Sequence, residues 1–262
     1  MTPYWSSTSE ICRNIRKRCC STYETTVSDP VRASVLDMLG ETAAELEAFV
    51  RGYESIVDPS IDTDDEILNW AFSETTADVC SAIWLLASGF YKGSASSLRS
   101  ALDISTASLY FQIRENNEPR SGGYNKFFSS WDAGTRDTPN WGEMKPYISS
   151  QPSVVRFKRN NGIDVVDEAY EHFRYLCAFA HTRAFASNRD SISAINTTGV
   201  APSFNEEYFQ RGRDMTLKTM SLTAILWKIA FPKIASAPGA IGTDAHNTLF
   251  PDHLGQLALN HK

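Results

Sequence analysis

Residues 170–183 read YEHFRYLCAFAHTR, and this stretch decides the fold expected of the chain. Its apolar residues recur at three- and four-residue intervals, the spacing that buries one face of an α-helix. The pattern therefore predicts a core helix over residues 164–186. Arg174 and His181 interrupt the apolar run seven residues apart, about two helical turns, so they share one stripe. We expect this stripe at the edge of the buried face, away from the solvated face of Glu171.

The same periodicity predicts four further long helices. They cover residues 30–57, 63–91, 95–114 and 203–230. No stretch alternates like a half-buried strand, so the sequence predicts an all-α, antiparallel bundle of about five long helices. Glycine, proline and serine break the pattern over residues 115–163, which we interpret as a loop-rich insertion with one short helix near 141–148. Trp131 and Trp141 are too large to remain exposed, so we expect this insertion to fold against the bundle.

The chain divides into three parts on this interpretation. A short basic segment, SEICRNIRKRCC at 9–20, marks an N-terminal region over residues 1–28. The helical domain with its insertion follows over residues 29–235, and a tail without long helices covers residues 236–262.

Composition excludes several classes of protein. The 262 residues are 42% hydrophobic and 21% charged, as in an ordinary globular protein. A net charge of −6 argues against a general duplex binder, which needs a broad basic face. No run of about 18 apolar residues appears, so we predict no membrane contact. The five cysteines form no CxxC pair, and we expect reduced thiols in a cytoplasmic protein.

Three groups of residues are candidates for chemistry. The motifs GxxxxGK[ST], GxGxxG, HExxH and GxSxG are absent, and we predict neither a metal nor a cofactor. In LRSALD (98–103), Arg99 and Asp103 lie one turn apart and are expected to form an intrahelical ion pair. If this helix faces residues 164–186, Asp103 could instead orient Arg174 or His181. We expect His172 to be solvated.

A third candidate is the stretch RFKR at 156–159. Arg156, Lys158 and Arg159 flank an aromatic residue, a mixture that contacts single-stranded nucleic acid in other proteins. A solvated loop without a ligand is the other interpretation of this stretch.

The spacing of Arg174 and His181, together with HFRYLCAFAH (172–181) and LRSALD (98–103), resembles the HEPN superfamily. The resemblance covers about residues 65–230. It implies a helical bundle that forms a homodimer and cleaves RNA without a metal, as a toxin or in phage defence. In that chemistry a histidine moves a proton to or from the ribose 2′-hydroxyl or the leaving oxygen. An arginine holds the phosphate and stabilises the developing charge.

The resemblance leaves two other functions open. Tyr175 directly follows Arg174, where active members have a polar residue, and many HEPN-like proteins are inactive binding or dimerisation modules. Such a module would bind itself, a partner protein or an antitoxin. A helical pocket for a small ligand or a nucleotide is the third hypothesis.

Overall fold

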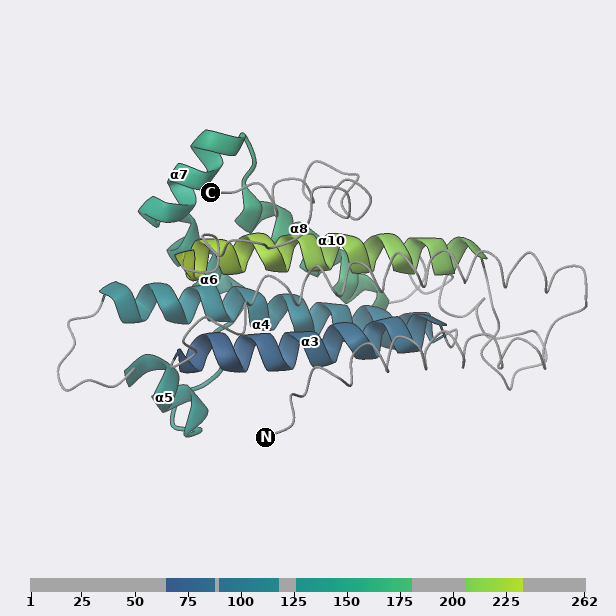
Figure 1. The fold of residues 1–262 in the computed structure, drawn as a ribbon, viewed down its shortest axis with the longest axis horizontal. Coiled ribbons are helices and arrows are strands. Elements are labelled where there is room, and N and C mark those ends of the chain that lie inside the picture. Colours follow the sequence, from purple (N-terminus) through teal and green to yellow (C-terminus); the bar gives the residue numbers. More distant parts are fainter. Residues whose placement is uncertain (1–64, 88–89, 118–125, 181–205, 233–262) are drawn as a thin grey trace, which may run out of the picture.

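The computed structural model describes residues 65–87, 90–117, 126–180 and 206–232. Every element in these ranges is an α-helix, which confirms the predicted all-α class. Four helices are long: α3 (Glu66–Ala87), α4 (Tyr91–Asn117), α8 (Val165–Ala180) and α10 (Glu206–Ala230). They alternate in direction along the chain and lie side by side as a bundle (Figure 1). The predicted helix 30–57 and the regions 1–28 and 236–262 lie outside the described residues.

The ends of the long helices follow local chemistry. α3 begins after Asp65, whose side-chain Oδ1 accepts a hydrogen bond from the backbone N–H of Leu68 at 3.1 Å. Asp164 caps α8 in the same way, accepting from the backbone N–H of Asp167 at 3.1 Å. A carboxylate at this position satisfies N–H groups that have no partner within the helix, and it complements the helix dipole. α10 ends at Ala230, two residues before Pro232, as the sequence predicts.

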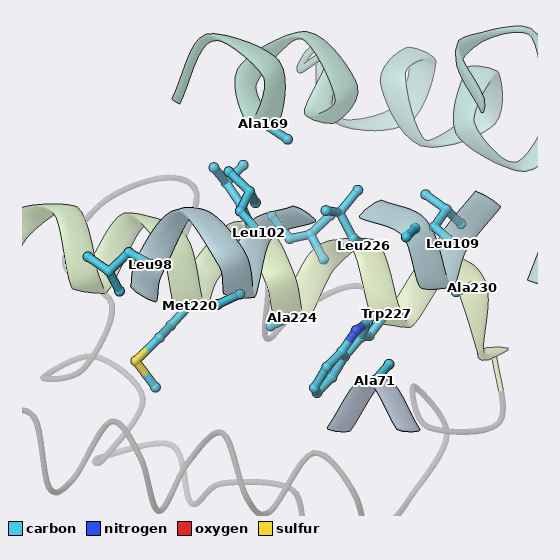
Figure 2. Packing of buried hydrophobic residues seen from close by; sticks show 14 of the residues in the cluster. Ala71, Leu98, Leu102, Leu109, Ala169, Met220, Ala224, Leu226, Trp227 and Ala230 are labelled. Atoms are coloured by element: carbon cyan, nitrogen blue, oxygen red, sulfur yellow. The ribbon is translucent and has the colours of Figure 1, made fainter. Parts of the chain in front are cut away.

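α10 is the central helix of the bundle. Its residues from Thr219 to Trp227 are all buried, so this helix is covered on every side. Trp227 packs towards Ala71 of α3, while Leu226 lies near Leu109 of α4 (Figure 2). Buried hydroxyl groups on α10 have partners both within the helix and on its neighbours: Thr216 Oγ1 donates to the Gly212 carbonyl at 2.8 Å, and Thr219 Oγ1 lies 2.9 Å from His172 Nε2 of α8. Because α10 is buried on every side, its side chains set the positions of α3, α4 and α8 around it.

α4 packs against α3, α10 and α8. A buried side-chain hydrogen bond of 3.0 Å joins Ser105 Oγ of α4 to Thr223 Oγ1 of α10. Near the other end of the same two helices, the Tyr91 and Tyr208 rings lie 5.8 Å apart. Contacts at two matching levels show that α4 and α10 run in the same direction.

The predicted insertion forms three short helices, α5 (Lys126–Asp132), α6 (Trp141–Ser149) and α7 (Pro152–Asn161). The prediction of one short helix near 141–148 is confirmed by α6, whereas α5 and α7 were expected as loop. Aromatic side chains fold the insertion onto the bundle: the Trp70 and Trp131 rings lie 4.7 Å apart. Trp141 is buried, as its size required, and Trp131 packs against the core from a partly buried position.

Candidate functional site

The buried face of α8 is rotated from the one that the sequence predicts. The stripe that the sequence predicts consists of Val166, Ala169, Phe173, Leu176 and Ala180. The residues buried on α8 are Val165, Val166, Ala169, His172, Leu176 and Phe179, whereas Phe173 is only partly buried. At about 100° per residue the centres of the two stripes differ by about 40° around the helix axis. This rotation brings His172 into the core and turns Arg174 to the opposite side of the helix.

Arg174 is therefore exposed, which corrects the expectation that it lies at the edge of the core. Its side chain is 62% exposed, and its Nη1 lies 3.3 Å from Glu171 Oε1, on the solvated face. The guanidinium also lies 6.0 Å from the centre of the Tyr170 ring. An exposed ion pair of this kind is weak, so Arg174 remains accessible to an anion in solution.

The other half of the predicted pair, His181, lies outside the described residues, as does the predicted helix beyond Ala180. Tyr175 is described and is 44% exposed, with its ring 5.2 Å from that of Phe179. An accessible arginine next to an accessible aromatic side chain is thus the described part of this candidate site.

His172 is buried, so the expectation that it is solvated is wrong. Its Nε2 lies 2.9 Å from Thr219 Oγ1 of α10, with only 5% of the residue exposed. Burial and, to a smaller extent, the positive charge of Lys218 lower the pKa of His172, and a backbone hydrogen bond at Met215 opposes them; the net result is a pKa of about 4. His172 is therefore neutral at physiological pH and joins α8 to α10.

The basic stretch 156–159 lies on a helix, so the loop interpretation is wrong for its backbone. Arg156, Lys158 and Arg159 are all exposed on α7. Lys158 Nζ is engaged by Asp164 Oδ2 at 2.7 Å, and this carboxylate raises the pKa of the lysine. Among the described residues, Arg156 and Arg159 form no ion pair. Two of the three predicted cations are therefore available on the surface of α7.

The predicted pair of Arg99 and Asp103 is confirmed on α4. Arg99 Nε lies 3.8 Å from Asp103 Oδ2, an ion-pair distance that is longer than a hydrogen bond. The expectation that Asp103 orients Arg174 is not met, because the carboxylate has a different partner. Asp103 Oδ1 accepts a hydrogen bond from the indole Nε1 of Trp141 on α6 at 2.6 Å.

α8 also contributes residues next to Arg99 and Asp103. The Arg99 guanidinium lies 5.7 Å from the centre of the Phe173 ring, and the Phe173 and Trp141 rings lie 5.1 Å apart. Cys177, a free thiol one turn further along α8, is close enough for the charges of Arg99 and Asp103 to act on its pKa. We call Arg99, Asp103, Trp141, Phe173 and Cys177 the α4–α6–α8 cluster.

Asp103 carries the carboxyl group of this cluster, and its pKa is strongly perturbed. Desolvation raises its pKa to about 6, and this effect outweighs the hydrogen bond from Trp141 and the positive charge of Arg99, which both lower it. The side chain is nevertheless 35% exposed and that of Arg99 33% exposed. A partly accessible carboxyl group with a pKa near neutrality is a candidate for proton transfer.

The role of Trp141 was not predicted from the sequence. The sequence did contain a hint of this role. A buried indole N–H needs a hydrogen-bond acceptor, and few side chains in a protein core can accept a hydrogen bond. Asp103 and Trp141 are 38 positions apart, and only the packing of α6 against α4 pairs them.

Within the described ranges, no group of three histidine, cysteine, aspartate or glutamate residues could hold a metal ion. No described helix is long and apolar enough to cross a membrane. A scan against protein-family models, a search of curated proteins and a search of solved structures each found no match to this chain.

Proposed function

We propose that this chain is a HEPN-like endoribonuclease that cleaves single-stranded RNA without a metal, with Arg174 binding phosphate and His181 transferring a proton. The observation that carries the proposal is the accessibility of Arg174. Its side chain is 62% exposed, and among the described residues its ion-pair partner is Glu171, which is itself exposed. A phosphate can replace such a partner at little cost, because an exposed ion pair contributes at most about 1 kcal/mol.

The distribution of charge supports a single-stranded substrate. The chain is acidic overall, so RNA must be bound by a local patch rather than by a general basic face. The exposed Arg156 and Arg159 on α7 supply such a patch, three residues apart on one helix. Lys158 is expected to contribute less, because Asp164 neutralises it at 2.7 Å.

The chemistry follows from the residue types. An imidazole with a pKa near neutrality can accept a proton from the 2′-hydroxyl or donate one to the leaving 5′-oxygen. A guanidinium stays charged at all accessible pH values and stabilises the extra negative charge of the transition state. In a homodimer, a second copy of the motif would supply the complementary acid or base. The toxin or phage-defence setting comes with the HEPN resemblance alone.

One experiment tests this proposal directly. Purified wild-type protein is incubated with labelled total RNA in EDTA, beside Arg174→Ala, His181→Ala and the control Lys92→Ala. Lys92 is exposed on α4 and carries the same charge as Arg174. We expect wild type and Lys92→Ala to cleave equally, and both site variants to lose at least about 100-fold in rate. Identical RNA patterns in all four samples would refute the proposal.

A second function, an inactive module that binds a protein partner, an antitoxin or a second copy, is favoured by Tyr175. Exposed aromatic side chains beside an arginine are enriched at protein interfaces. Tyr175 is 44% exposed on the same helix as Arg174. Sedimentation of wild type and Tyr175→Ser distinguishes self-association: a dimer lost in the variant, with no RNA cleavage by either protein, would favour this alternative.

A further inference from the structure

The α4–α6–α8 cluster contains a carboxylate that the fold does not require to be charged. Asp103 accepts one hydrogen bond, from Trp141 Nε1 at 2.6 Å, and an asparagine oxygen could accept it equally well. Its contact with Arg99, at 3.8 Å, is an ion pair whose distance is longer than that of a hydrogen bond. A charge that is desolvated and only partly compensated destabilises the folded state, so its presence calls for another role.

Both charged groups of the cluster can be reached from solvent. About one third of each side chain is exposed, 33% for Arg99 and 35% for Asp103. Phe173 and Trp141 wall the cluster on the side of α8 and α6, with rings 5.1 Å apart. The Arg99 guanidinium can therefore bind an anion, and the Asp103 carboxylate, one turn away on α4, can accept a proton. Both lie beside the apolar wall formed by Phe173 and Trp141.

We infer that Asp103 is the general base of the proposed RNA cleavage and that Arg99, one turn away on α4, binds the phosphate that is attacked. The inference rests on the proposed function and adds to it two residues of α4, the helix that packs against α8. The ligand class is single-stranded RNA with a free 2′-hydroxyl next to the phosphate that is cleaved.

The proposed reaction is an internal transesterification. The Asp103 carboxylate takes the proton of the 2′-hydroxyl while the 2′-oxygen forms a bond to phosphorus. The bond between phosphorus and the 5′-oxygen breaks, and that oxygen takes a proton from a water molecule. The products are a 2′,3′-cyclic phosphate and a 5′-hydroxyl end, and Asp103 returns its proton to the solvent.

The electrostatics of the cluster suit this role. With a pKa of about 6, Asp103 is ionised at neutral pH and is a stronger base than an ordinary aspartate. The groups that face it are Arg99 on its own helix, the uncharged indole of Trp141 on α6, and Cys177 on α8. Burial raises the pKa of the Cys177 thiol, so this group stays neutral while Asp103 titrates.

The test is the pH dependence of kcat/KM for a fluorescent single-stranded RNA, measured in EDTA between pH 4.5 and pH 8 for wild type, Asp103→Asn, Trp141→Phe and Arg99→Lys. We expect the wild-type rate to rise with pH through a midpoint near 6. Asp103→Asn should lose about 100-fold or more and show no such rise. A substrate with 2′-deoxyribose at the cleaved position should be inert.

The other two variants separate catalysis from structure. Trp141→Phe removes a hydrogen bond that lowers the pKa of Asp103, so the midpoint should move to higher pH. Arg99→Lys keeps the charge but loses the planar pair of donors, so KM should rise about 10-fold while the midpoint stays in place. Circular dichroism shows whether Asp103→Asn folds. If it does not, the midpoint of Trp141→Phe and the KM of Arg99→Lys still test whether Asp103 is the base.

The outcomes distinguish this inference from the proposed function. If wild type cleaves RNA and Asp103→Asn keeps both its rate and its midpoint, the inference is overturned while the proposed function stands. A Trp141→Phe variant that is slower but has an unmoved midpoint also overturns it, since Asp103 would then only hold α6. A wild type that cleaves no RNA at any pH removes the proposed function and this inference together.

Discussion

His172 of α8 and Thr219 of α10 meet in the buried seam between the two helices, with His172 Nε2 2.9 Å from Thr219 Oγ1. The contact places a titratable ring where a charge would be desolvated. Lys218, the neighbour of Thr219, adds a like charge near the ring, although Glu168 pairs with that lysine at 3.1 Å. The seam that holds α8 in place is therefore sensitive to pH.

The first prediction concerns this sensitivity. The pKa of His172 is about 4 in the folded chain, below the 6.5 of an unperturbed histidine. The unfolded state therefore binds the proton more tightly, so stability is full above pH 6.5 and falls as the pH decreases towards 4. This one group should cost about 3 kcal/mol over that window.

Urea unfolding of wild type and His172→Gln at a series of pH values measures this cost. The glutamine variant should be less stable at pH 7, because it loses packing, and it should show a shallower decline with falling pH. Equal slopes for the two proteins between pH 6.5 and 4 would contradict a buried neutral imidazole.

A second prediction concerns the stability of the Asp103→Asn variant. The pKa of the Asp103 carboxyl is raised in the folded state, so its ionised form costs stability above pH 6 and costs nothing below about pH 4. Because 35% of the side chain is exposed, we expect the variant to gain only about 1 kcal/mol at pH 7.5. The gain should vanish at pH 4, which guanidinium unfolding at the two pH values would show. A variant less stable than wild type at pH 7.5 would mean that the ionised carboxylate supports the fold.

A third prediction compares two helical glycines. A Cβ atom on Gly212 of α10 would lie 2.2 Å from Leu86 Cδ1, and Leu86 is completely buried. Overpacking should therefore outweigh the better helix propensity of alanine, and Gly212→Ala should lose about 1–3 kcal/mol. On Gly93 of α4 the same atom would lie 3.2 Å from Leu85 Cδ1, and Leu85 is only partly buried and has room to move. Gly93→Ala should be neutral or slightly stabilising in a thermal melt.

A fourth prediction tests the availability of Arg174. Glu171→Gln removes the carboxylate that lies 3.3 Å from Arg174, so the affinity for a single-stranded RNA should rise about two- to fivefold. The matched control is Glu207→Gln, which makes the same charge change beside Arg211, at 2.9 Å, on α10. Fluorescence anisotropy at fixed salt measures both. An equal gain in the two variants would indicate general electrostatics and no specific part for Arg174.

The helices themselves follow from local sequence. Apolar spacing predicts all four long described helices. The structure shows that Asp65 and Asp164 cap the starts of two of them. Such features depend on neighbours within about four residues, which the sequence contains. The short helices α5 and α7 were missed because their glycine- and proline-rich surroundings carry weak periodicity, and packing onto the bundle stabilises them.

The site depends on contacts that the sequence does not contain. The pair of Arg99 and Asp103 was predictable because both residues lie on one helical turn. The partner of Asp103 was not, since Trp141 approaches from α6 after a separation of 38 residues. The exposure of Arg174 was also not predictable, because it follows from how α8 is rotated against α10.

Local sequence patterns were enough to predict that the described part of this chain is all-α, which of its residues form the long helices, and which polar residues interrupt their apolar faces. A helical wheel fixes the angles between residues on one helix, but it leaves the rotation of that helix free. A rotation of about 40° around the axis of α8 is enough to bury a histidine and expose an arginine, while the local sequence pattern stays the same. Only the tertiary structure decided that His172 faces α10, that Arg174 faces solvent and that Asp103 meets Trp141, because packing against the neighbouring helices sets that rotation.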